Sequence, residues 1–211
     1  MIPLAVVLIT ALVLAMPPLA GWFSATMPRH QLLQVPAMLL LGVLAVRSAR
    51  RRGLRLPDTH NWDPALLVLA VGAMLFWMIP RSLDIASTNA VADQLLHVSW
   101  FLIGAIAANS LPRVSFIVGV ALAIHALAML IMLGVVYQRY PGLICTAYTM
   151  EQQRYTGRIL LYAAPILGAI LWTWLIVRFF RAQTASGTIA TTASPPETAT
   201  GPALVLKHER A

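Results

Sequence analysis

The chain has 211 residues, of which 59% are hydrophobic and only 10% are charged. Soluble domains carry about a quarter charged residues, so this composition excludes an ordinary soluble protein and indicates an all-α, polytopic membrane helix bundle. The net charge of +8 comes mostly from basic residues beside apolar runs, where they act as topology signals rather than as a nucleic-acid surface. The single cysteine, Cys145, excludes an internal disulfide and any metal site built from several cysteines.

Six apolar stretches are long enough, or nearly so, to cross about 30 Å of hydrocarbon. We expect these spans at residues 1–23, 31–46, 64–79, 93–112, 114–137 and 158–180. The first lacks a basic amino-terminal region and a small-residue cleavage site, so it is predicted to be a membrane helix that Pro17 and Pro18 kink near its end. Polar loops are expected at 82–93 and 138–157.

Two regions follow from this pattern. Residues 1–181 are predicted to form the transmembrane bundle, and residues 182–211, rich in Thr, Ala, Ser and Pro, a disordered cytoplasmic tail that cannot bury a core. With the amino terminus outside and the carboxyl terminus inside, ten of the 15 Lys and Arg residues lie on the cytoplasmic side. The dense arginine segment at 47–55 decides this orientation.

Candidate metal ligands gather on the outer face in this topology. His97 lies about one turn inside the apolar stretch 93–112, where an imidazole must face protein, water or a metal. His30, at the start of the second span, is expected at a similar depth. Imidazole, thioether and thiolate ligands suit copper, with Glu151, Met150, Cys145 or Met27 as a third ligand. Both histidines can also be read as ordinary hydrogen-bonding residues near helix ends.

His125 is treated separately because it lies about 15 Å from either end of its helix. It is expected either to serve a deeper metal or proton site or to be a neutral imidazole bonded to Asn109 or Ser99. A haem held by two histidines is a rival to copper, and only His30 and His97 offer matched depth for it. Motifs of hydrolases, metalloproteases and nucleotide-binding enzymes are absent from the sequence, so no enzymatic activity is predicted.

Four stretches together resemble a known family. They are RHQLLQVPAMLLLG at 29–42, DQLLHVSWFLIGAIAANSLP at 93–112, HALAMLIMLGVVYQRYPGL at 125–143 and EQQRYTG at 151–157. In this order they are similar to the CtaG-type cytochrome c oxidase assembly factors, although Gln34 stands where that family commonly has a second histidine.

The resemblance implies a copper-linked assembly factor in the bacterial cytoplasmic membrane, with a haem-copper oxidase subunit as its partner. It implies His30, His97 and His125 as ligands or relays, with Glu151 as a further ligand. Residues supporting the site, or serving as additional ligands, would be Gln152, Met150, Cys145 and Asp93. Two alternatives stay open: a scaffold or small subunit of a respiratory complex that binds no metal, and a bis-histidine haem electron carrier.

Overall fold

The computed structural model describes residues 2–54, 57–144 and 146–192. All regular secondary structure in these ranges is helical, which confirms the predicted all-α class. Five helical segments are long and apolar enough to cross a membrane, as expected for a multi-pass membrane protein. They are Met27–Arg51, His60–Met78, Ala90–Ser110, Phe116–Arg139 and Met150–Arg181.

The first predicted span is where the structure differs most from expectation. Instead of one helix over residues 1–23, the chain forms α1 (Leu4–Ala15) and the short α2 (Leu19–Ser24). Pro17 and Pro18 lie between them, and a proline supplies no backbone N–H to continue the helical ladder. At 1.5 Å per residue, α1 is only about 18 Å long, too short to cross the hydrocarbon alone.

The second predicted span is one continuous helical segment with an irregular start. It comprises α3 (Met27–Arg29), a π-helical turn η1 (His30–Gln34) and α4 (Val35–Arg51). The third span is α5 (Asp63–Met78), which follows the 3₁₀ turn η2 (His60–Trp62).

Residues 82–93 were predicted to be a loop, and this prediction is wrong. They lie mostly in α6 (Pro80–Thr88) and in the first turn of α7 (Ala90–Ser110). In α6, Leu83 and Ala86 are buried one turn apart, a helical spacing that the polar composition of the stretch conceals. The amide side chain of Asn89 accepts hydrogen bonds from two backbone N–H groups at the start of α7, which fixes where that helix begins.

The last two long helices are α8 (Phe116–Arg139), capped by the Ser115 hydroxyl, and α9 (Met150–Thr192). Two compact units are distinguished, Met1–Leu171 and the part of the chain from Trp172 onward, so α9 begins in the first and continues in the second. Residues 193–211, which make up most of the predicted disordered tail, lie outside the described residues.

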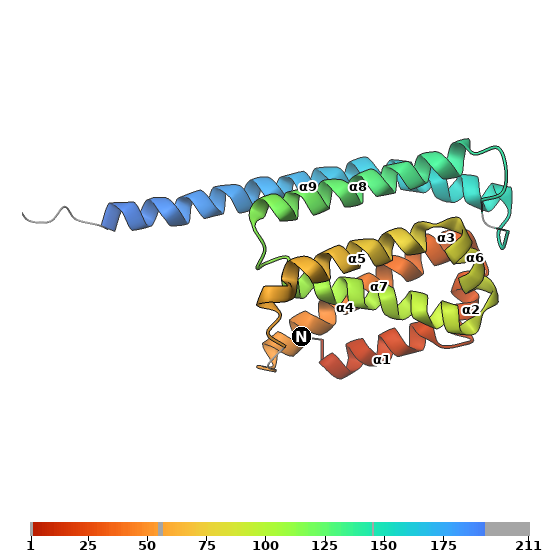
Figure 1. Cartoon of the computed structure of the whole chain (residues 1–211), viewed down its shortest axis with the longest axis horizontal. Helices are drawn as coiled ribbons and strands as arrows, with labels where there is room; N and C mark the ends of the chain where they lie inside the picture. Colours follow the sequence, from red (N-terminus) through yellow and green to blue (C-terminus); the bar gives the residue numbers. More distant parts are fainter. Residues whose placement is uncertain (1, 55–56, 145, 193–211) are drawn as a thin grey trace, which may run out of the picture. The chain divides into compact units, whose positions relative to one another are not determined.

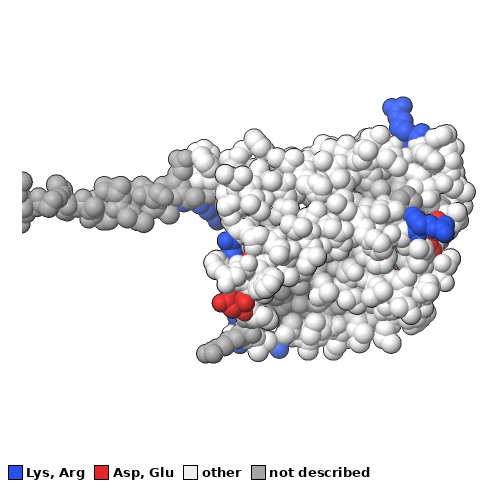
Figure 2. Space-filling view, viewed as in Figure 1, with Lys and Arg blue, Asp and Glu red and all other residues white. Residues whose placement is uncertain are grey.

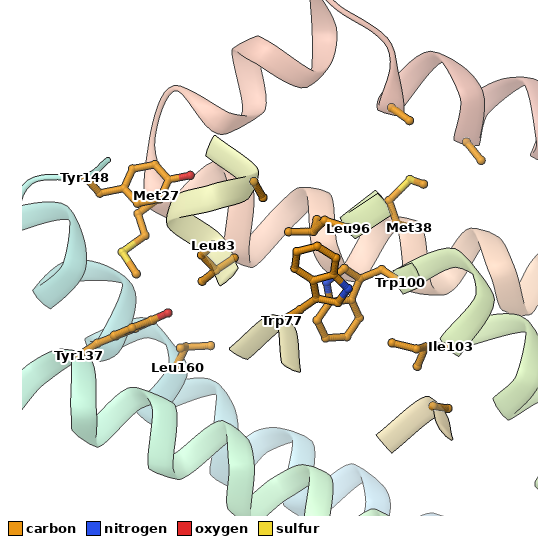
Figure 3. Packing of buried hydrophobic residues seen from close by; sticks show 14 residues of the cluster. Met27, Met38, Trp77, Leu83, Leu96, Trp100, Ile103, Tyr137, Tyr148 and Leu160 are labelled. Atoms are coloured by element: carbon orange, nitrogen blue, oxygen red, sulfur yellow. The ribbon is translucent and has the colours of Figure 1, made fainter. Parts of the chain in front are cut away.

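In the first unit, α7 packs between α4 and α5, and α1 lies against α4 (Figure 1). Trp77 of α5 and Trp100 of α7 lie together in the buried cluster, with Leu96 and Met38 beside them (Figure 3). On the face drawn in Figure 2, charged side chains gather toward the two ends of the described bundle, and the surface between them is uncharged. This distribution is expected for helices whose middle faces lipid.

The closest approach between helices is the crossing of α4 and α7. A Cβ atom added to Gly42 would collide with the carbonyl oxygen of Phe101, and one added to Gly104 would collide with that of Leu39. Small residues at such a crossing let two membrane helices approach backbone to backbone. This crossing holds the parallel helices α4 and α7 close together along the bundle.

Candidate functional site

His30 is positioned by the π-helical turn that precedes α4. The backbone N–H of Val35 bonds the carbonyl of His30, five residues back, in place of the usual four. Pro36 follows immediately and cannot donate to the ladder, which favours a widened turn at this point. Such single π turns within α-helices often occur at functional sites. The turn buries both His30 and Gln34, whose side chains then meet.

His97 lies near the start of α7, one turn after Asp93. Its Nδ1 is 2.7 Å from the backbone carbonyl oxygen of Asp93, and 3.6 Å from the Oδ1 of the same residue. The residue is only 1% exposed, whereas the Asp93 side chain is 21% exposed. Asp93 therefore orients the imidazole from the rim of the bundle.

The structure brings the two histidine rings together, as the sequence analysis expected. The ring centroids of His30 and His97 are 6.3 Å apart, and the ring planes are nearly perpendicular at 87°. His30 is 3% exposed. Because α4 and α7 run parallel, two residues from the first turns of these helical segments meet toward one end of the bundle.

The hydrogen bonds around the pair show which nitrogen of each ring carries a proton. Gln34 Nε2 donates to the carbonyl of Leu14 at 3.1 Å, so its Oε1 faces His30, 3.0 Å from Nδ1. An amide oxygen only accepts, so His30 Nδ1 carries a proton. His97 Nδ1 donates to a backbone carbonyl in the same way. In the neutral form of each ring the lone pair is therefore on Nε2, and His97 Nε2 is buried without a hydrogen-bond partner in the structure.

The carboxyl-terminal end of α1 closes over this region. Gln34 bonds the carbonyl of Leu14, and Gln94 Nε2 donates to the carbonyl of Ala15 at 2.5 Å. The last carbonyls of a helix have no partner inside the helix, so these two amides satisfy groups that burial would otherwise leave unpaired. Gln34 thus links α1 to the ring of His30.

The remaining predicted ligands are not gathered around the pair. Glu151 is exposed in the first turn of α9, Gln152 Oε1 accepts from the backbone N–H of Met27 at 3.4 Å, and the Met150 sulfur is 3.9 Å from Gln153 Nε2. Cys145 lies outside the described residues. Within the described ranges, no group of three or more His, Cys, Asp and Glu side chains is placed to hold an ion.

His125 lies near the middle of α8, and no contact joins it to the other two histidines in the described structure. The two neighbours expected to bond it are engaged elsewhere: Ser99 donates to the carbonyl of Leu95, and Asn109 bonds Thr59 and Arg50. The expectation of those partners was wrong. Its Nε2 is buried and lacks a hydrogen-bond partner in the structure.

A second buried polar cluster lies where α5 begins and α7 ends, and the sequence patterns did not reveal it. Asp63, 2% exposed, pairs with Arg113, whose Nε and Nη2 lie 2.7 and 2.8 Å from the two carboxylate oxygens. The hydroxyls of Thr59 and Ser110 each donate to Oδ1 of Asp63 at 2.8 Å. An aspartate in the first turn of an apolar helix, with an arginine just after another helix on the same predicted side, was the available signal.

Comparison of this chain with protein-family models, with curated proteins and with solved structures finds no significant match. The residues of this chain, and the geometry that brings His30 and His97 together, are what bear on its function. The resemblance to CtaG-type factors stays a prediction from sequence motifs.

Proposed function

We propose that the chain is a membrane-embedded copper-handling protein that holds a monovalent copper ion between His30 and His97 as cargo. The observation that carries the proposal is a pair of buried imidazoles in contact, each anchored at Nδ1 so that the lone pair lies on Nε2. Histidine ligands of metals typically donate their other ring N–H to a carbonyl or carboxylate, as both rings do here.

Burial makes an unpaired ring nitrogen costly. A buried ring nitrogen without a partner costs free energy, on the order of 1–3 kcal/mol, and proteins keep few such groups unless something else fills the position. His97 Nε2 is such an atom. A soft cation accepts the lone pair directly, which removes this penalty.

The small ligand set favours transfer rather than storage. Imidazole suits copper, and two metal–nitrogen bonds of about 2.0 Å each would bring the two Nε2 atoms to about 4 Å from one another. Two nitrogen ligands do not complete the four-ligand shell of a structural metal site. An ion held in this way can pass to a partner that offers more ligands.

The proposal also assigns a side of the membrane and a partner. The arginines at the end of α4 favour placing that end in the cytoplasm, which puts His30 and His97 on the outer side, with the chain's amino terminus outside and its carboxyl terminus inside. Together with the CtaG-type motifs, this supports a role in delivering copper to a haem-copper oxidase subunit in a bacterial cytoplasmic membrane. A carboxyl-terminal fluorescent-protein fusion should then fluoresce, because such fusions mature in the cytoplasm.

A scaffold that binds no metal is the second candidate, and one observation favours it. No third His, Cys, Asp or Glu side chain joins the pair within the described residues. In that case the two rings would only pack α4 against α7. Copper binding separates the two candidates.

The experiment is a Cu(I) competition titration of the purified full chain under anaerobic conditions with a chromophoric chelator. We expect about one ion per chain, and a loss of affinity of at least about 100-fold in the His30→Ala/His97→Ala double variant. His60→Ala is the matched control. His60 is exposed in η2, just before α5, and lies away from the histidine pair, so its loss should leave the affinity unchanged. Equal and negligible copper binding in the wild type and the double variant would contradict the copper proposal and support the scaffold. A Soret absorption band would instead indicate the haem electron carrier.

A further inference from the structure

An open surface pocket of about 290 Å³ lies at the cytoplasmic ends of α4 and α7, as assigned above. Its lining residues are Arg50, Leu54, Pro57, Asp58, Asn109 and Arg113. Leu54 and Pro57 make one part of the wall apolar, whereas the two arginines and Asn109 offer several N–H donors. The pocket lies at the ends of membrane-spanning helices, about 30 Å along the helix from His30.

Arg113 is held in place from within the bundle. Its guanidinium bonds both carboxylate oxygens of Asp63 and the hydroxyl of Thr59. Asn109 is fixed too, because its Nδ2 donates to Thr59 and its Oδ1 accepts from Arg50 Nη2 at 2.9 Å. The polar wall is therefore preorganised, so little further ordering would be needed when a ligand enters.

Arg50 brings positive charge that the pocket does not fully neutralise. The carboxylate of Asp63 is committed to Arg113, and Oδ1 of Asp58 accepts the backbone N–H of His60 at 3.1 Å. The last turns of α4 also carry three exposed arginines besides Arg50, namely Arg47, Arg51 and Arg52. The pocket lining itself holds two arginines and one aspartate, and these three exposed arginines add positive charge nearby in the chain.

We propose that this pocket binds the phosphate group of an anionic membrane lipid. Arginine offers paired N–H donors that match phosphate oxygens, and basic pockets between membrane helices on the cytoplasmic side bind lipid head groups. The apolar wall at Leu54 and Pro57 suits the glycerol and first methylenes of a lipid better than a free ion. The site is separate from the histidine pair and does not depend on copper.

The test is native mass spectrometry of the purified full chain titrated with phosphatidylglycerol, with phosphatidylcholine as the zwitterionic comparison. We expect retention of phosphatidylglycerol over phosphatidylcholine, weakened about fivefold in Arg50→Gln. Arg139→Gln removes the same charge at the far end of α8 and should change retention less than about twofold. Leu54→Trp fills the pocket without changing charge, so it should weaken retention as well.

Three results would overturn the proposal. One is an equal loss in Arg50→Gln and Arg139→Gln, which would indicate diffuse surface attraction. Another is unchanged retention in both Arg50→Gln and Leu54→Trp. The third is Arg50-dependent binding of inorganic phosphate without binding of phosphatidylglycerol, which would make the pocket a site for a soluble anion. Arg50→Lys, which keeps the charge, should retain most of the lipid and guards against a folding defect.

Discussion

Two buried polar clusters at opposite ends of the α4–α7 pair can be compared directly. In the Asp63 cluster, one carboxylate receives a guanidinium and two hydroxyls. In the histidine pair, both Nδ1 atoms are bonded, but His97 Nε2 is buried with no partner in the structure. The Asp63 carboxylate, at the start of α5, therefore has hydrogen bonds at Oδ1 and an ion pair at Oδ2, whereas the histidine pair keeps one buried ring nitrogen without a partner.

The difference teaches how to separate structural from functional polar groups in an apolar bundle. A satisfied cluster stabilises the helix ends that it joins, and removing one member leaves the others without compensation. An incomplete cluster costs stability, and a ligand that completes it would remove that cost. Four substitutions sharpen or break this comparison.

The largest effect on stability is expected for Asp63→Asn. This change leaves Arg113 beside a neutral side chain, and removing one partner of an ion pair leaves the other charge uncompensated. Thermal unfolding of the purified protein in detergent measures the loss. Asp58→Asn, at an exposed loop position, should leave the unfolding temperature nearly unchanged. An equal and small shift in both variants would show that the ion pair does not hold this end of the bundle.

The next effect is expected for Gly104→Ala at the helix crossing. The added methyl would collide with the carbonyl of Leu39, and overpacking of this kind costs about 1–3 kcal/mol. Gly72→Ala in α5 meets no atom within 4 Å, so it should be neutral or stabilising by up to about 1 kcal/mol. Opposite signs in the two unfolding experiments support the close crossing, and matching signs contradict it.

Gln34→Leu should have a smaller effect on stability and a clear one on the site. It removes the bonds to His30 and Leu14, at a cost of about 1–2 kcal/mol. Loss of the group that orients the ring should weaken Cu(I) binding about 10- to 100-fold. Gln31→Leu is the same chemical change three residues earlier, and it should leave copper affinity intact. Normal Cu(I) affinity in the Gln34 variant would show that the Gln34 amide does not support the copper site.

The smallest stability change is expected for His97→Phe. The substitution removes a buried nitrogen that has no partner along with one that does, so unfolding should shift by less than about 1 kcal/mol. Copper binding should nevertheless be lost. If this variant unfolds as easily as Asp63→Asn, the ring is structural, and the contrast between the two clusters fails.

Much of the fold was predictable from the sequence because the spans are long apolar runs bounded by polar residues. The helical class, α5, α7 and α8 follow from that pattern. The broken first span and α6 did not: a double proline interrupts one run, and only two of the buried residues of α6, Leu83 and Ala86, are apolar. Both departures from the prediction depend on local backbone geometry and packing rather than on composition.

For the site, depth matching along the helices predicted that His30 and His97 would meet. The sequence did not reveal the π turn, the role of Gln34 as an anchor, or the burial of Asp63, because each depends on which helix faces lie together. The topology and the motif resemblance both proposed Glu151 as a ligand, and the resemblance alone proposed Gln152. The structure places Glu151 on the surface, and Gln152 accepts a hydrogen bond from the backbone of Met27. Contacts between distant helices were the missing information.

The most direct test of the central claim is X-ray absorption spectroscopy of the Cu(I)-loaded full chain and its His30→Ala/His97→Ala variant. The account predicts imidazole scattering from two nitrogens at about 2.0 Å in the wild type, absent from the double variant. Copper that is bound without imidazole ligands, or with the same spectrum in both proteins, would contradict it.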